Sequence, residues 1–242
     1  MRSAKYLVAI WLFISTTNAD WRKNFKYYFG IFFYYYFLKT NANGRAEIGF
    51  PKIEPYHINT FTVGTNSGGG VALKIIFNDI ELSGLSKGNF ERIEGFSADA
   101  ETSKFEGTAV FPALKLKGKY EADGQILILP IQGKGDVDLT LENCRISMKF
   151  KPTVTKKDGK TYLAINKLKA LTEPSKMIIK LENLFNGDKT LGDNMNTFLN
   201  ENWKDVWVEV NPSVNKVIEG IFSNIIKGFF EKVVYEDILL KD

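Results

Sequence analysis

The sequence predicts an α+β fold in which an antiparallel sheet wraps one long C-terminal helix. From about Val71 to Leu184, apolar and polar residues alternate in repeated runs, which is typical of half-buried strands. After Thr190 the apolar residues recur every three or four positions, which indicates one face of a helix. Because no helical segment interrupts the strands, a parallel sheet with crossover helices is excluded. The 242 residues suffice for a sizeable core.

Residues 1–19 have the pattern of a secretory signal peptide. Arg2 and Lys5 give a positive start, Tyr6–Ile14 is apolar, and small residues precede a cleavage point after Ala19. The apolar run is shorter than the roughly 17–25 residues that span a bilayer. We therefore expect a secreted, extracellular protein, whose formal net charge falls from +4 to +2 when Arg2 and Lys5 are removed.

Residues 20–42 form an atypical aromatic-rich segment. Trp21–Leu38 contains eleven aromatic residues in eighteen and no acidic residue. Three interpretations remain open for this segment. It is an anchor at a membrane surface, an aggregation-prone strand, or translated intron sequence that does not belong to the mature protein.

Individual strands can be placed from the alternation between Val71 and Leu184, where we expect six to eight strands. In Ala113–Tyr120 the leucines and Tyr120 share one face and the lysines the other, and Val137–Leu141 and Ile146–Phe150 alternate in the same way. Asp123-Gly124 and Asp158-Gly159 each lie between two such runs. Since Asp-Gly favours the positive φ of a tight turn, both pairs predict hairpins.

The last fifth of the sequence predicts one helix of about forty residues, about 60 Å long. Asp188 and Thr190 are candidate N-terminal caps, and Pro212 should bend or briefly interrupt the helix. Its apolar face is broader than a sheet covering one side requires. A wrapped helix explains that breadth, with an interior that is either fully packed or hollow; apolar faces usually pack.

Chemistry-bearing residues are few. His57 is the single histidine and has no partner ligands nearby for zinc, so we expect it to be structural or exposed. Cys144 is the single cysteine and lies in a predicted strand, which favours a buried, inert side chain. No block of like charge supports nucleic-acid binding. We expect a protein that is not an enzyme and that holds no cofactor and no metal.

Several segments, in order along the chain, resemble the takeout and juvenile-hormone-binding family of insects. They are GRAEIGFPKIEP at 44–55, LSGL at 82–85, the run at 111–143, KKDGKTYL at 156–163, LENLFNGDKTLGDNMNTFLNENW at 181–203 and VVYEDIL at 233–239. The likeness covers residues 43–242 almost completely, which defines the expected domain.

The resemblance implies an elongated α/β-wrap, related to the TULIP lipid-binding proteins, in which a strongly curved antiparallel sheet encloses an apolar tunnel. It also implies two cysteines after the signal peptide that form a disulfide. Neither cysteine is present here, and a missing disulfide typically costs a small secreted domain about 2–5 kcal/mol.

The implied function is that of a monomeric carrier for a small hydrophobic ligand, such as juvenile hormone, another terpenoid, or a prenyl or fatty molecule. Transient contact with a membrane or receptor is also expected. The alternative functions are lipid extraction or transfer at a membrane surface through the aromatic segment, and a non-functional product. Met and aromatic side chains adapt to irregular ligands. The candidate lining residues are Phe77, Phe111, Leu116, Ile126, Leu129, Leu139, Met148, Phe150, Met195, Phe198, Leu199, Trp203, Phe222 and Ile225.

Overall fold

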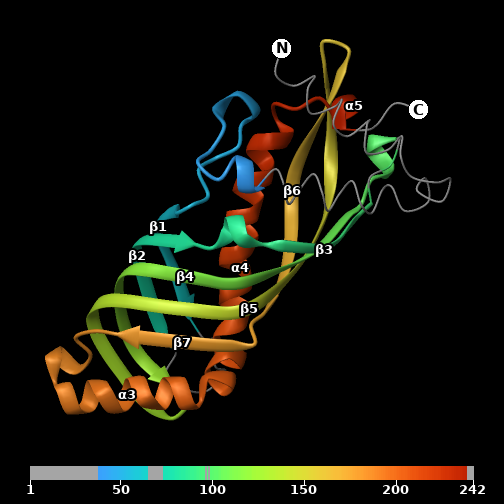
Figure 1. Cartoon of the computed structure of the whole chain (residues 1–242). Helices are drawn as coiled ribbons and strands as arrows, with labels where there is room; N and C mark the ends of the chain where they lie inside the picture. The colour runs from blue at the N-terminus through green and yellow to red at the C-terminus, as the bar shows by residue number, and fades with distance from the viewer. Residues whose placement is uncertain (1–37, 65–72, 96, 98, 239–242) are drawn as a thin grey trace, which may run out of the picture.

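The computed structural model describes residues 38–64, 73–95, 97 and 99–238. Within these residues, an antiparallel sheet curls around a long helix (Figure 1). The strands are β1 (Tyr56–Gly64), β2 (Lys74–Ser83), β3 (Asn89–Glu94), β4 (Phe105–Ile126), β5 (Leu129–Lys157), β6 (Lys160–Glu173) and β7 (Lys176–Leu181). The α-helices are α3 (Lys189–Glu201), α4 (Trp203–Phe230) and α5 (Tyr235–Ile238).

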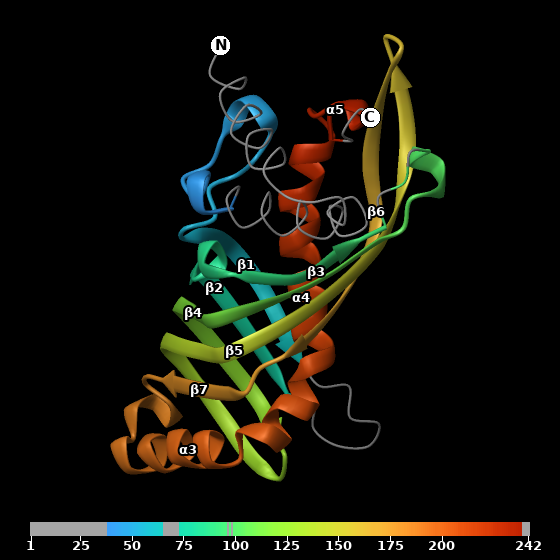
Figure 2. The ribbon, with the colours of Figure 1, turned by 45° about the vertical axis from the view of Figure 1, so that its right-hand side comes forward.

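The sheet has the order β1-β2-β4-β5-β6, and all its pairings are antiparallel. The short strand β3 pairs with β4, and β7 pairs with the first half of β5. A turned view shows α4 running along the concave side of the sheet, with α3 across one end (Figure 2). The predicted α+β wrap is therefore confirmed.

The long strand β5 changes face at Asn143. Val137 and Leu141 are buried at odd positions, whereas Ile146 and Met148 are buried at even positions. Asn143 has a φ of 42°, and it and Pro112 on β4 are both left unpaired in a β4–β5 ladder whose register stays constant. The left-handed backbone at Asn143 explains why the sequence pattern shifts phase there, and it lets one strand follow the curvature of the sheet.

The two predicted hairpins have different outcomes. Asp158-Gly159, with φ values of 51° and 72°, forms the β5–β6 turn as predicted. The prediction at Asp123-Gly124 is wrong, because β4 continues to Ile126 and turns at Leu127 and Ile128. Ile126 is buried, whereas Ile128 is 82% exposed. Burial of Ile126 therefore fixes the strand register, and the turn begins three residues beyond the Asp-Gly pair.

The prediction of one continuous helix of about forty residues is also wrong. Asp188 caps α3 by accepting a hydrogen bond from the Leu191 amide, but the helix ends at Glu201 and restarts at Trp203 after the non-helical Asn202. α4 continues through Pro212. Because Pro212 has no N–H, the Val208 carbonyl loses its helical donor. Both residues lie on the exposed side of α4, where water can satisfy that carbonyl.

Asparagine side chains on α3 cover the free edge of β7. The Asn196 amide accepts from the Leu181 N–H at 2.8 Å and donates to the Leu181 carbonyl at 2.9 Å. Asn200, one turn later, makes the same pair of bonds with Ile179 at 2.9 and 2.7 Å. Each side-chain amide therefore replaces the peptide group of a missing neighbouring strand.

Polar side chains of α4 cover the edge of β6 in the same way. Asn211 donates to the Thr172 carbonyl at 2.9 Å, and Asn215 accepts from the Thr172 N–H at 3.0 Å. Glu219 accepts from the Ala170 N–H at 3.2 Å. These three helical residues are spaced by four, so they lie in one row that faces the strand edge.

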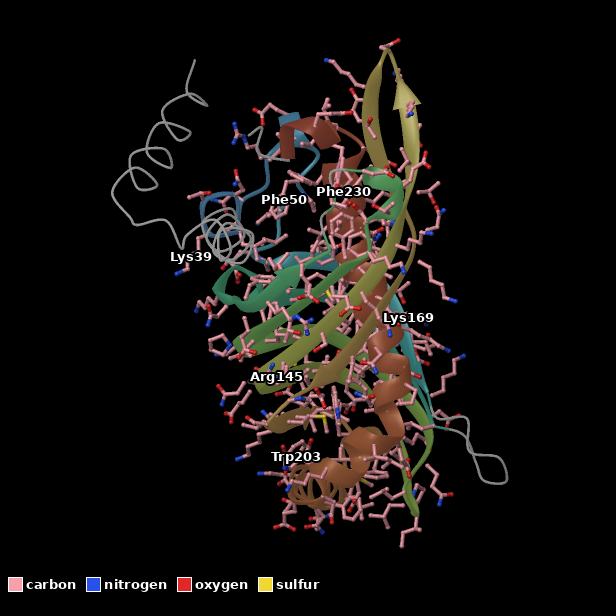
Figure 3. All side chains as sticks on the ribbon, turned by 90° about the vertical axis from the view of Figure 1, so that its right-hand side faces the viewer. Lys39, Phe50, Arg145, Lys169, Trp203 and Phe230 are labelled. Atoms are coloured by element: carbon pink, nitrogen blue, oxygen red, sulfur yellow. The ribbon has the colours of Figure 1, made fainter. Side chains whose placement is uncertain are left out.

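An aromatic cluster closes the far end of the helix. Phe105 stacks on Phe150 with ring centroids 4.8 Å apart, and Phe230 approaches Phe105 at 5.8 Å. Tyr235 is buried beside them, and its hydroxyl donates to the Ser97 carbonyl at 2.7 Å. Phe230 thus lies at the opposite end of α4 from Trp203 at the α3–α4 corner (Figure 3).

Replacing Asn196 by alanine should destabilise the fold. The change leaves the N–H and the carbonyl of Leu181 without partners, which costs about 1–3 kcal/mol. Asn194→Ala, at an exposed position of the same helix, should change the free energy of unfolding by no more than about 0.5 kcal/mol. Urea denaturation of both variants measures the difference, and equal stabilities would refute the edge-covering role.

Candidate functional site: an apolar cavity beside an open groove

An apolar cavity lies between the curled sheet and α4. Its volume is about 100 Å³, and all its lining side chains are aliphatic or aromatic. On the sheet side they include Phe77, Leu114 and Leu139, and on the helix side Val210 and Ile218. The alternation of the strands and the broad face of α4 both direct these side chains inward.

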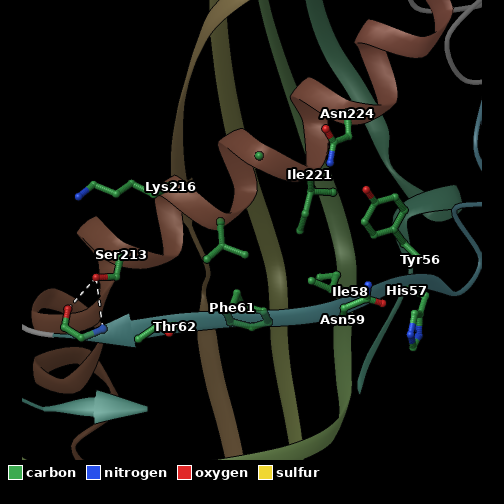
Figure 4. Close-up of a pocket in the computed structure, with 13 residues that line it drawn as sticks. Tyr56, His57, Ile58, Asn59, Phe61, Thr62, Ser213, Lys216, Ile221 and Asn224 are labelled. Carbon is green, nitrogen blue, oxygen red and sulfur yellow. Dashed lines mark hydrogen bonds between the residues drawn. The ribbon is translucent and has the colours of Figure 1, made fainter. Parts of the chain in front are cut away.

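A larger groove of about 710 Å³ lies beside the cavity, between β1 and α4. Its walls combine apolar residues with Tyr56, Asn59, Ser213, Lys216 and Asn224 (Figure 4). The groove and the cavity share four lining residues, which are Ile58, Phe61, Val217 and Ile221. The two spaces are therefore neighbours that share walls.

Phe61 lies at the boundary between these spaces. Its ring stacks on Phe77, with centroids 4.8 Å apart and an interplanar angle of 19°. Ser213 fixes one end of the groove, where its hydroxyl donates to the Gly64 carbonyl at 2.6 Å and accepts from the Gly64 N–H at 3.4 Å (Figure 4). Within the described residues, β1 has no other hydrogen bond to α4.

The structure brings five of the fourteen candidate residues to the cavity wall. They are Phe77, Leu116, Ile126, Leu139 and Leu199. The other nine lie elsewhere in the core. The ring centroids of Phe111 and Phe222 are 6.3 Å apart, and Phe150 belongs to the aromatic cluster. The remaining six are buried or half-buried in the main core: Leu129, Met148, Met195, Phe198, Trp203 and Ile225.

Most of the cavity wall lies outside the candidate set, which consists mainly of large, adaptable side chains. The helix contributes smaller ones, including Val206, Val210 and Val214, and the first two strands contribute Ile58, Phe61 and Ile75. The periodicity of α4 already marks these valines as inward-facing. Small side chains leave space in an otherwise close-packed core, and residue volume is the sequence signal that indicates it.

Burial shifts the pKa of two groups among the described residues. Desolvation raises the pKa of the Cys144 thiol to about 12 and the pKa of the Tyr120 phenol to about 12. Cys144 is fully buried, and the Tyr120 hydroxyl donates to the Glu182 carbonyl at 2.8 Å. Both groups stay protonated at neutral pH, so neither brings a charge into the interior.

His57 is exposed and lines the outer groove. Across the described residues, no three His, Cys, Asp or Glu side chains gather where a metal ion could be held. Among the helices in that same part of the chain, none is long and apolar enough to cross a membrane.

A family model described as haemolymph juvenile hormone binding protein matches residues 35–240. This match covers most of the sequence, so the chain belongs to that family. The match begins inside the aromatic-rich segment assigned to residues 20–42. Since residues 1–37 lie outside the described structure, the signal peptide and the nature of that segment remain predictions.

Relatives and a solved structure are consistent with this membership. The circadian clock-controlled protein daywake of Drosophila melanogaster is 29% identical over 85% of this chain and 81% of its own length. A Schistocerca gregaria protein named as a proposed beta-carotene-binding protein is 22% identical over 81% of this chain and 76% of its own. The crystal structure of Epiphyas postvittana takeout 1 superposes with a TM-score of 0.74 at 28% identity, covering 86% of this chain and 93% of the other.

The burial of Cys144 predicts slow thiol chemistry. With a pKa of about 12, about one thiol in ten thousand is ionised at pH 8, and the thiolate is the nucleophile. A disulfide reagent such as DTNB should therefore react with the folded protein orders of magnitude more slowly than with the protein in guanidinium chloride. Rapid reaction in native buffer would contradict the burial.

Proposed function

We propose that this protein is a secreted, non-enzymatic carrier that shields a small hydrophobic ligand from water. The observation that carries the proposal is the cavity between the sheet and α4, whose lining is wholly apolar. Transfer of apolar ligand surface into such a space is favourable by about 25 cal/mol per Å². Membership of a family named for binding juvenile hormone supports the same function.

The sizes of the two spaces limit how a ligand can be held. Ligand pockets in proteins typically measure about 300–1,000 Å³, so a cavity of about 100 Å³ accepts only part of a terpenoid, prenyl or fatty molecule. The groove, at about 710 Å³, is large enough for the remainder. We therefore infer that the ligand spans both spaces or widens the inner one when it binds.

Secretion is part of the proposal and rests on the pattern of residues 1–19 and on the haemolymph family. Action as a monomer is likewise proposed. Lipid transfer at a membrane surface through Trp21–Leu38 is a separate hypothesis, and that segment lies outside the described residues apart from Leu38.

Native mass spectrometry of the secreted protein, followed by organic extraction, tests the carrier function. A stoichiometric apolar molecule that is released only on denaturation would support it and identify the ligand class. A folded protein that neither carries nor takes up terpenoid or fatty probes would overturn it.

A matched pair of substitutions on α4 links binding to the cavity. Val210 lines the cavity and is 8% exposed, whereas Val208 is 73% exposed on the same helix. Val210→Phe should fill part of the space and weaken binding of a fluorescent fatty probe, while Val208→Phe should leave the dissociation constant unchanged.

Circular dichroism and thermal melts of both variants separate lost binding from lost folding, because overpacking costs about 1–3 kcal/mol where a core has no room. If Val210→Phe folds and binds as well as Val208→Phe does, the cavity is not the ligand site.

A further inference from the structure

We propose that the groove between β1 and α4 binds the carboxylate head of a long-chain fatty acid, with Lys216 as its cationic partner, while the hydrocarbon chain enters the apolar cavity past Phe61. This inference rests on the carrier function and adds to it the chemical class of the ligand and the place of its head group.

Continuity of the two spaces is the first argument. Ile58, Phe61, Val217 and Ile221 line both the groove and the cavity, so a chain lying in the groove reaches the cavity wall directly. A molecule that spans both meets a polar margin at one end and only apolar side chains at the other. That gradient matches an amphiphile better than it matches a uniformly apolar hydrocarbon.

Charge complementarity is the second argument. Lys216 is the one Lys or Arg that lines the groove, and no Asp or Glu is among the described lining residues. The Lys216 side chain is exposed and makes no ion pair within the described part of the chain. Glu219, three residues further along the helix, bonds instead to Lys169 and to the Ala170 N–H of β6. A carboxylate in the groove therefore meets one cation and no competing anion.

The surface of α4 in the groove has room for a ligand. Lys216, Gly220 and Asn224 follow one another at intervals of four residues and form one row on the helix. A Cβ atom built on Gly220 has no heavy atom within 4 Å. The row is therefore open in the middle, with donors on either side that can hold an anionic head.

The two edges of the sheet differ in how α4 is bonded to them. Asn211, Asn215 and Glu219 bond α4 to the backbone of β6, whereas β1 is bonded to α4 through Ser213 alone within the described residues. The β1 side is thus the side on which helix and strand can separate enough to admit a chain.

The test compares cis-parinaric acid with its methyl ester, which has the same chain and no charge, by fluorescence titration. The protein should bind the acid about two- to fivefold more tightly than the ester, the range expected for one solvent-exposed ion pair. Lys216→Glu should remove or reverse this preference without weakening ester binding. Lys227→Glu, on the same helix but outside the groove, should leave the preference intact. Raising the salt concentration should reduce the preference.

Gly220→Phe tests the route independently of charge. Because the position is open, the variant should fold, yet its ring should obstruct the groove and slow the association of both probes in stopped-flow measurements. Val208→Phe serves as the control for an added ring on α4.

Equal binding of acid and ester by the wild-type protein, unaffected by Lys216→Glu, would overturn the head-group assignment and leave the carrier function standing. Unchanged association in Gly220→Phe would overturn the groove as the route. Failure of both probes to bind at all would instead overturn the carrier function itself.

Discussion

The fold depends on how α3 and α4 satisfy the backbone at one edge of a strongly curled sheet. Strand edges carry unpaired N–H and carbonyl groups, which favour aggregation when they stay open. Here Asn196 and Asn200 bond to β7, and Asn211 and Asn215 bond to β6, at distances of 2.7–3.0 Å. The helices therefore act as the next strand of the sheet, and this fixes where α4 lies over the concave face. The position of α4 in turn determines the shape of the interior.

The two edges of the sheet are covered unequally, and the site follows from that difference. On the β6 side, polar bonds hold α4 close to the strand edge. On the β1 side, α4 and the strand meet through Ser213 at one end and through apolar side chains around Phe61. Apolar contacts are non-directional, so they tolerate a change in separation that a row of hydrogen bonds does not. A binding site that must open to water is better placed along the second kind of contact.

Much of the fold could be predicted from the sequence, because its periodicities are strong. The alternation of Leu114 and Tyr120 with lysines, the Asp158-Gly159 turn and the Asp188 cap all reappear in the structure. The misplaced features depend on tertiary contacts. Burial of Ile126 outweighs the turn preference of Asp123-Gly124, and the β7 edge bonds of α3 set the helix corner at Asn202 instead of Pro212. The asparagines of α3 read as ordinary polar residues until their partner strand is known. The cavity wall was predicted in part, since periodicity gives the inward direction of a side chain but not the volume that its neighbours leave empty.

Two glycines of α4 show how packing and function can be separated. A Cβ on Gly228 would lie 2.2 Å from the Gly49 carbonyl oxygen, so close backbone contact with the N-terminal segment requires glycine there. Gly220 has no such neighbour, although glycine inside a helix costs about 1 kcal/mol relative to alanine. Packing therefore accounts for the first glycine and not for the second. What distinguishes Gly220 is its place between Lys216 and Asn224 on the wall of the groove, where even a small side chain would take up space that a ligand could occupy. The stability lost at this position is explained if the groove must stay open.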